Sequence, residues 1–96
     1  MSPLNKKKLN SLRLKLDKLD NELLKLIKKR SNLVNKVLKI KVYKNEIIDQ
    51  KRINFILKKI KNKSVKLKID TKITNRIWKN MIWSFIDYEK RNFKKK

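Results

Sequence analysis

The 96-residue sequence contains no cysteine, histidine, glycine or alanine, and its one proline is Pro3. Without cysteine or histidine the chain forms no disulfide or Cys/His zinc site and has no imidazole base. Without glycine it has no phosphate-binding loop of the P-loop or dinucleotide type, because those loops need glycine where the backbone approaches phosphate. No apolar run exceeds three residues, so we expect neither a membrane span nor a signal-peptide core. These absences predict a soluble, cytoplasmic chain that works through Lys, Arg and a few carboxylates.

Positive charge is abundant instead. Thirty Lys and Arg residues against eight Asp and Glu give a net charge of +22. Lysines outnumber arginines 25 to five, and twelve Ile and eleven Asn accompany them, a composition typical of A/T-rich codons. Most of the lysines therefore fit solvated helix faces. A charge of this size also attracts anionic small molecules or nucleic acid, so the charge alone does not identify the ligand.

A heptad pattern predicts a long first helix, from Leu4 to about Val42. Such a helix is roughly 50 Å long at about 1.5 Å per residue, whereas a compact chain of this size has a radius of gyration of about 13 Å. One chain does not cover an apolar stripe of that length, so the stripe predicts a partner, most simply a second copy. Its positions are Leu9, Leu12, Leu16, Leu19, Leu23, Leu26, Leu33 and Val37.

Two shorter helices follow in the pattern. Apolar spacing predicts one over about residues 48–61, and the polar stretch 62–68 is expected to be a loop. Asp70 and Thr71 are good N-cap residues for a third helix that ends near Asn92.

The predicted fold is therefore all-α, with a long, a short and a medium helix. We expect a single domain over residues 1–96, with residues 1–6 and 94–96 frayed.

Arg30 breaks the first apolar stripe, because it lies where leucine is expected, and Lys41 continues the same line. A buried cation is costly unless an anion meets it. Either Arg30 pairs with a carboxylate of another helix while Lys41 lies beyond the buried part, or both cations converge on a cavity that binds an anionic ligand.

Other polar residues allow two interpretations each. Asp49, with Arg52 three residues later, either complements the helix N-terminus or belongs to a site. Glu89 is either exposed at a helix end or turned inward on the apolar stripe, and Arg13 either pairs with Asp17 or contacts a ligand.

Three aromatic residues of the third helix are expected in the core rather than as stacking platforms for nucleic acid. They lie at helical spacing among Ile and Met, and they are Trp78, Trp83 and Phe85.

The run LRLKLDKLDNELLKLIKKRSNLVNKVLKIK, followed by DQKR and IWKNMIWSFIDYEK, resembles an all-α (AroQ-type) chorismate mutase over about residues 9–93. The resemblance implies an intertwined helical homodimer with two shared active sites that convert chorismate to prephenate without a cofactor or metal. It implies that Arg13 reaches into the partner's site. The residues that serve their own site would be Arg30, Lys41, Asp49, Arg52, Phe85 and Glu89.

Within that resemblance each side chain has an implied role. Arg13 and Arg30 would bind the substrate carboxylates. Lys41 would donate to the ether oxygen of the breaking bond. Arg52 would support a carboxylate or Asp49, and Asp49 would contact the ring hydroxyl or orient its cationic neighbours.

The sequence departs from the family pattern at two places. Ile53 stands where the family usually has Glu, which favours isochorismate–pyruvate lyase, an activity on the same fold, as the alternative reaction. On the last helix Phe85 and Glu89 replace the usual Ser and Gln, although a shift by one residue would use Ser84 and Tyr88 instead. A Glu at this position must be protonated to donate a hydrogen bond.

A third hypothesis is a non-enzymatic basic helical module that binds nucleic acid. The basic residues are spread over all faces and no nucleic-acid-reading motif is present, so we expect only weak, salt-sensitive binding and no specific nucleic-acid partner.

Overall fold

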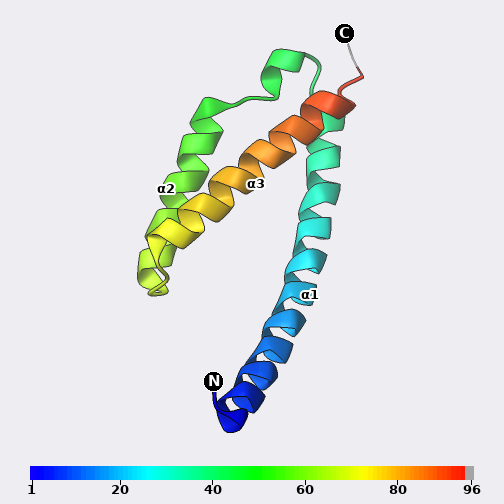
Figure 1. Cartoon of the computed structure of the whole chain (residues 1–96). Coiled ribbons are helices and arrows are strands. Elements are labelled where there is room, and N and C mark those ends of the chain that lie inside the picture. Colours follow the sequence, from blue (N-terminus) through cyan, green and yellow to red (C-terminus); the bar gives the residue numbers. More distant parts are fainter. Residues whose placement is uncertain (95–96) are drawn as a thin grey trace. The chain divides into compact units, whose positions relative to one another are not determined.

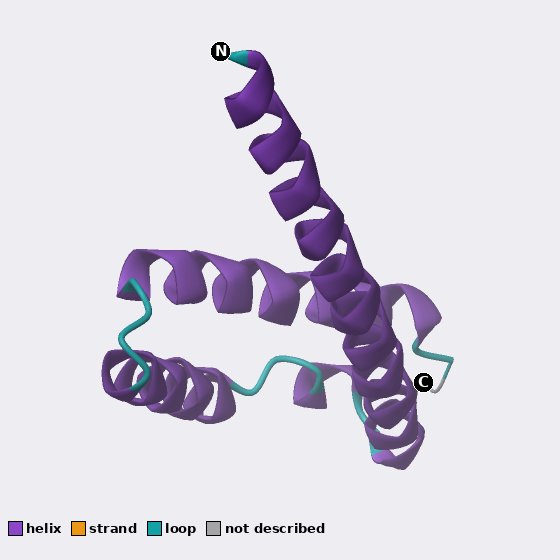
Figure 2. Ribbon diagram, turned by 90° about the horizontal axis from the view of Figure 1, so that it is seen from below, coloured by secondary structure: helices purple, strands orange, loops and turns teal. Residues whose placement is uncertain are grey.

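The computed structural model describes residues 1–94, which form helices joined by short segments and contain no strand (Figures 1 and 2). The elements are α1 (Pro3–Ile40), a 3₁₀ helix η1 (Lys44–Glu46), α2 (Gln50–Lys66) and α3 (Thr71–Asn92). The all-α prediction and the long, short and medium α-helices are confirmed. Of the expected C-terminal tail, Lys95 and Lys96 lie outside the described residues.

α1 begins at Pro3, whereas we expected residues 1–6 to be frayed. The Ser2 hydroxyl accepts a hydrogen bond from the Asn5 amide at 3.2 Å, as an N-cap does. Proline suits the first helical position because its missing N–H would have no partner there. Ser2 and Pro3 together therefore define the start of this helix.

The chain divides into two compact units, Met1–Leu33 and the part that begins at Val34. The first unit is the N-terminal part of α1. Six leucines of its heptad stripe are each 54–60% exposed: Leu12, Leu16, Leu19, Leu23, Leu26 and Leu33. A contiguous apolar stripe left in water is a feature of interaction surfaces, and the pairing of this helix with a partner stays a prediction.

The core lies in the second unit. Its buried apolar side chains come from α1, the segment after η1, α2 and α3, and they are Leu38, Ile47, Ile53, Ile82 and Ile86. Ile56, Leu57 and Phe93 pack against this cluster. The core therefore fixes the end of α1 against α2 and α3.

α2 and α3 lie side by side (Figure 1) and are also joined by two buried hydroxyls. Ser64 Oγ lies 2.8 Å from Thr74 Oγ1, and Ser64 Oγ also donates to the Ile60 carbonyl at 2.6 Å. Ser64 continues the inner face of α2 four residues after Ile60. The loop predicted over residues 62–68 is wrong in its first part, because a polar residue occupies a buried helical position.

α2 ends in a Schellman motif that contains no glycine. The Ile69 amide donates to the Ser64 carbonyl at 2.9 Å and the Lys68 amide to Val65 at 3.1 Å. Lys68 has φ 57°, the left-handed conformation that glycine usually supplies at this position. The chain then enters α3, where Asp70 accepts from the Lys72 amide at 2.8 Å, which confirms Asp70 as the N-cap.

Candidate active site

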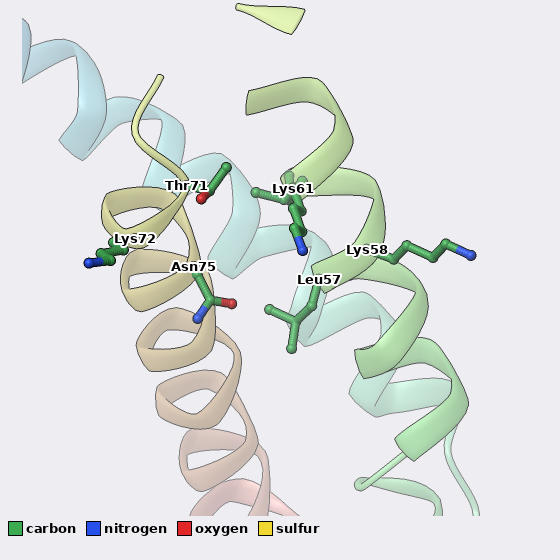
Figure 3. A pocket seen from close by; sticks show the side chains of 7 residues that line it. Leu57, Lys58, Lys61, Thr71, Lys72 and Asn75 are labelled. Carbon is green, nitrogen blue, oxygen red and sulfur yellow. The ribbon is translucent and has the colours of Figure 1, made fainter. Parts of the chain in front are cut away.

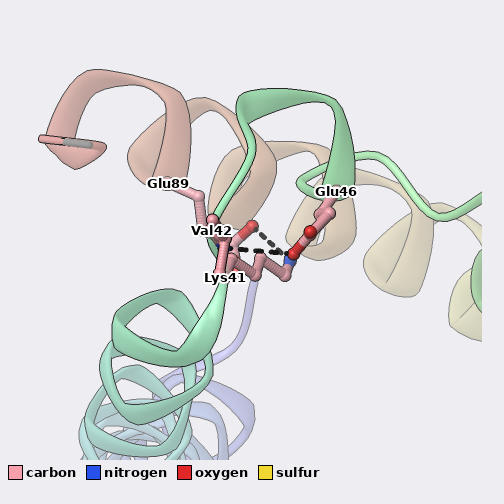
Figure 4. A network of polar contacts seen from close by, with 4 residues as sticks. All are labelled: Lys41, Val42, Glu46 and Glu89. Carbon is pink, nitrogen blue, oxygen red and sulfur yellow. Dashed lines mark hydrogen bonds and ion pairs between the residues drawn. The ribbon is translucent and has the colours of Figure 1, made fainter. Parts of the chain in front are cut away.

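Lys41 and Glu89 form the most buried ion pair among the described residues. Lys41 Nζ lies 3.1 Å from Glu89 Oε2, and the two side chains are 18% and 8% exposed (Figure 4). Lys41 directly follows the last residue of α1, whereas Glu89 lies on the α3 face that also buries Ile82 and Ile86. The interpretations that put Lys41 beyond the buried part and Glu89 in solvent are therefore wrong.

The segment after Lys41 is held in place by hydrogen bonds between its own residues. The Val42 amide donates to Glu46 Oε2 at 3.3 Å (Figure 4), and the Glu46 amide donates to the Tyr43 carbonyl at 3.1 Å. Ile47 then enters the core at 3% exposure. The connection between α1 and α2 is thus folded back immediately beside Lys41. Nothing in the sequence pattern indicated that the Glu46 carboxylate would accept the Val42 amide.

Asp49 is the N-cap of α2. Its Oδ1 accepts a hydrogen bond from the Arg52 amide at 3.0 Å, so the structural interpretation of Asp49 holds, and it leaves the second carboxylate oxygen for other contacts. The Arg52 side chain is exposed, and its Cζ lies 5.6 Å from the Phe55 ring centroid. Ile53, the residue that departs from the expected Glu, is buried in the core at 5% exposure.

The last turns of α3 place Phe85 and Glu89 on the inner side. Phe85 is half-buried one turn before Glu89, whereas Ser84 is exposed. Tyr88 is half-buried, and its hydroxyl donates to Asn35 Oδ1 at 2.8 Å, a bond to α1 that the sequence pattern did not reveal. The alternative alignment, shifted by one residue, would use Ser84 and Tyr88. In the structure Ser84 lies in solvent and Tyr88 is bonded to Asn35.

The aromatic residues divide between the faces of α3. Trp78 is half-buried, but Trp83 is 47% exposed, so its placement in the core was wrong. Trp83 directly follows the buried Ile82, and one residue turns a helix by about 100°. An apolar residue inside an apolar run is thereby carried to the outer face.

Arg13 and Arg30 both lie on α1 in the first unit. Arg13 is exposed, and within residues 1–94 it forms no ion pair with Asp17; Arg30 is half-buried. The two arginines are 17 positions apart on one continuous helix, a separation of about 25 Å at 1.5 Å per residue. No single small ligand spans both side chains of the same copy.

A separate hollow of about 400 Å³ lies between α2 and the start of α3 (Figure 3). Leu57, Lys61 and Asn75 point into it, whereas Lys58 and Lys72 point away. It includes Thr71, which is 18 positions, or roughly 27 Å along α3, from Glu89. Lys61 is the one lysine of its lining that points inward, and the hollow is separate from the Lys41–Glu89 pair.

The described part of the chain offers neither a cluster of metal ligands nor a membrane-spanning helix. Residues 1–94 contain no group of three or more His, Cys, Asp or Glu side chains that could hold a metal ion. No helix in that range is long and apolar enough to cross a membrane. The candidate site is thus a cation and a carboxylate beside an apolar core. These two groups include no Ser, Cys or His nucleophile.

Comparison with known proteins gives one family. The family model described as chorismate mutase type II matches residues 12–90, which include every candidate site residue. No curated protein and no solved structure matches the chain significantly.

Proposed function

Because this chain belongs to the chorismate mutase type II family, we propose that it catalyses the rearrangement of chorismate to prephenate. The observation that carries the proposal is the buried Lys41–Glu89 pair, whose members lie inside the matched region and face each other next to the core. Family membership supports the activity, and this pair supplies the charged groups that the reaction needs.

The reaction suits a site without a nucleophile. It is unimolecular, so the enzyme has to hold the substrate in its reactive conformation and stabilise the charge that develops on the ether oxygen. In this proposal Lys41 donates a hydrogen bond to that oxygen, and Glu89, which faces Lys41 at 3.1 Å, holds the second position beside it. No metal or cofactor takes part in this proposal.

Substrate binding has to rearrange the Lys41–Glu89 pair. In the free chain the ammonium is 3.1 Å from the carboxylate, so the two groups satisfy each other. Chorismate is a dianion that competes with Glu89 for the ammonium. The substrate therefore has to displace Glu89 from Lys41 before the ammonium can reach the ether oxygen.

The remaining contacts are assigned to two copies of the chain. Arg13 and Arg30 are about 25 Å apart on α1, so both reach one substrate only if they come from different copies. The exposed leucine stripe of α1 supports pairing of two such helices. We propose a homodimer in which Arg13 enters the partner's site and Arg30 binds a carboxylate of chorismate in its own.

The start of α2 and the inner face of α3 complete the proposed site. Arg52 supports a substrate carboxylate or Asp49, and Asp49 contacts the ring hydroxyl with the oxygen that does not cap α2. Phe85 supplies an apolar wall one turn from Glu89. We place Glu89, rather than Tyr88, in the site because Glu89 is buried against Lys41 and Tyr88 is bonded to Asn35.

Isochorismate–pyruvate lyase is the second candidate, and Ile53 is the observation that favours it. The side chain is buried among apolar residues and offers no carboxylate to a ring hydroxyl. The two reactions are distinguished by supplying purified protein with chorismate or with isochorismate and identifying the products. Prephenate from chorismate supports the proposal. Salicylate and pyruvate from isochorismate alone, with chorismate unchanged, would replace it with the lyase.

A further inference from the structure

The outer face of α2 combines positive charge with an exposed aromatic ring. Gln50–Lys66 contains seven Lys and Arg residues and no Asp or Glu. At about 100° per residue, one group of side chains lies opposite the buried Ile53 and Ser64: Lys51, Phe55, Lys58, Lys59, Asn62 and Lys66. We call these six residues the α2 outer face. It has no part in the proposed reaction.

Phe55 is the apolar centre of this face. The ring is 54% exposed, with Arg52 Cζ at 5.6 Å and Lys59 Nζ at 5.7 Å from its centroid. A hollow of about 440 Å³ is lined by Phe55 and by side chains that follow it along the helix, among them Lys59 and Lys66. An aromatic ring flanked by cations beside such a hollow offers stacking and charge together.

We propose that the α2 outer face binds single-stranded nucleic acid without sequence preference, with a base stacked on Phe55 and phosphates on the flanking lysines. Aromatic platforms in a basic groove are the usual means of binding single strands. From Lys51 to Lys66 the face is about 22 Å long, which matches roughly six stacked nucleotides.

The composition of the face favours a single strand over other polyanions. A helix that lies on a lipid bilayer buries a broad apolar face, and here Phe55 is the one apolar member of the six. A duplex keeps its bases stacked inside, so it offers phosphates but no base for Phe55. The proposal requires binding that depends on both charge and the ring.

The test uses the full chain and a fluorescent 20-nucleotide thymidine oligomer, with binding followed by anisotropy between 50 and 300 mM salt. Phe55→Ala should weaken binding about tenfold with little change in salt dependence, and Phe55→Trp should restore it. The triple variant Lys58→Gln, Lys59→Gln, Lys66→Gln should reduce the slope of log affinity against log salt by about two.

The matched control carries the same change in net charge on α1, with glutamine at Lys6, Lys7 and Lys8, which are all exposed. It should retain wild-type binding. The proposal is overturned if the two triple variants lose the same affinity for the oligomer, or if Phe55→Ala binds it as tightly as the wild type. Either outcome would assign binding to the diffuse electrostatic field of a chain with a net charge of +22. The proposal is also overturned if Phe55→Ala lowers binding to vesicles of anionic phospholipid but not to the oligomer.

Discussion

Lys41 Nζ and Glu89 Oε2 lie 3.1 Å apart although 48 positions separate them in the chain, and both side chains are largely withdrawn from water. Two desolvated charges stabilise each other only while both are present, because removal of one leaves the other buried without a counterion. The pair joins the end of α1 to the last turns of α3, so it connects stability with the proposed chemistry.

The stability of the second unit should depend on both members of this pair. Lys41→Met leaves the Glu89 carboxylate buried without its cation, and we expect unfolding free energy to fall by about 3 kcal/mol. The double variant Lys41→Met, Glu89→Leu should recover much of that loss. Urea unfolding at one protein concentration measures both.

The matched control is Lys25→Met, which breaks an ion pair with Glu22 whose side chains are 71% and 68% exposed. Water screens such a pair, so we expect no measurable change in stability. A Lys41→Met variant as stable as this control would mean that the Lys41–Glu89 pair is not a buried ion pair in solution.

Glu89→Gln tests whether Glu89 takes part in the proposed reaction. A glutamine amide donates a hydrogen bond from the position that faces Lys41, so Glu89→Gln should retain turnover, whereas Glu89→Leu, which has no donor, should lose it. The measurement is kcat for chorismate at one pH. Lys41→Met is the reference for loss of the other donor, with kcat about 10²–10³-fold lower. Equal kcat in Glu89→Gln and Glu89→Leu would remove Glu89 from the reaction.

Asp49 has a structural role and a proposed substrate role, and two substitutions separate them. Asn is as good an N-cap as Asp, so Asp49→Asn should unfold like the wild type while turnover falls. Asp49→Ala loses the bond to the Arg52 amide and should also cost about 1 kcal/mol of stability. Asp70→Ala removes the corresponding cap of α3 at a distance from Lys41, and it should lose stability alone. Full turnover in Asp49→Asn would leave Asp49 with the capping role only.

The end of α2 is the clearest place to stabilise the chain. Lys68 has φ 57°, and a residue with a Cβ in this region costs about 1 kcal/mol relative to glycine. Lys68→Gly should therefore raise the unfolding free energy by up to about 1 kcal/mol. Lys63→Gly, five positions earlier inside the helix, should lower it by a similar amount. The opposite order, with Lys68→Gly the less stable variant, would show that α2 does not end in a left-handed residue.

Much of the fold follows from periodicity and capping, and the errors have definite causes. The apolar spacing predicts three helices, and Asp70 predicts the start of α3. The end of α2 was placed too early because Ser64 is polar and yet buried against Thr74, and because Lys68 takes the left-handed position that glycine usually marks. Trp83 departs from the predicted core because nearly every residue of the run 81–86 is apolar, so apolar spacing does not distinguish the inner from the outer face there.

Part of the candidate site was also within reach of the sequence. A cation at Lys41 and a carboxylate at Glu89 on otherwise apolar faces predict polar groups turned inward, and the two meet. Their partnership depends on long-range packing, which residue spacing does not contain. The same applies to the bond between Tyr88 and Asn35 and to the loop contact of Glu46. The roles of Arg13 and Arg30 come from the family resemblance and remain predictions.

The shared site can be tested by mixing inactive variants. Arg13→Ala and Arg30→Ala should each lose nearly all turnover while the dimer persists, because in the proposed site each arginine makes a bidentate contact to a substrate carboxylate. If Arg13 acts across the dimer, a mixed dimer has one site that lacks both arginines and one site that keeps both. Random exchange makes half of the dimers mixed, so activity should recover to about a quarter of the wild-type value.

Analytical ultracentrifugation of each variant checks that dimers form, and turnover is measured before and after subunit exchange. The control is a mixture of Arg30→Ala with Lys41→Met, two residues assigned to the same copy's site. In that mixed dimer each site carries one defect, so no activity should return. If the Arg13→Ala and Arg30→Ala mixture stays as inactive as this control although its subunits exchange, Arg13 and Arg30 belong to the same copy's site, and the proposed exchange of arginines between subunits is excluded.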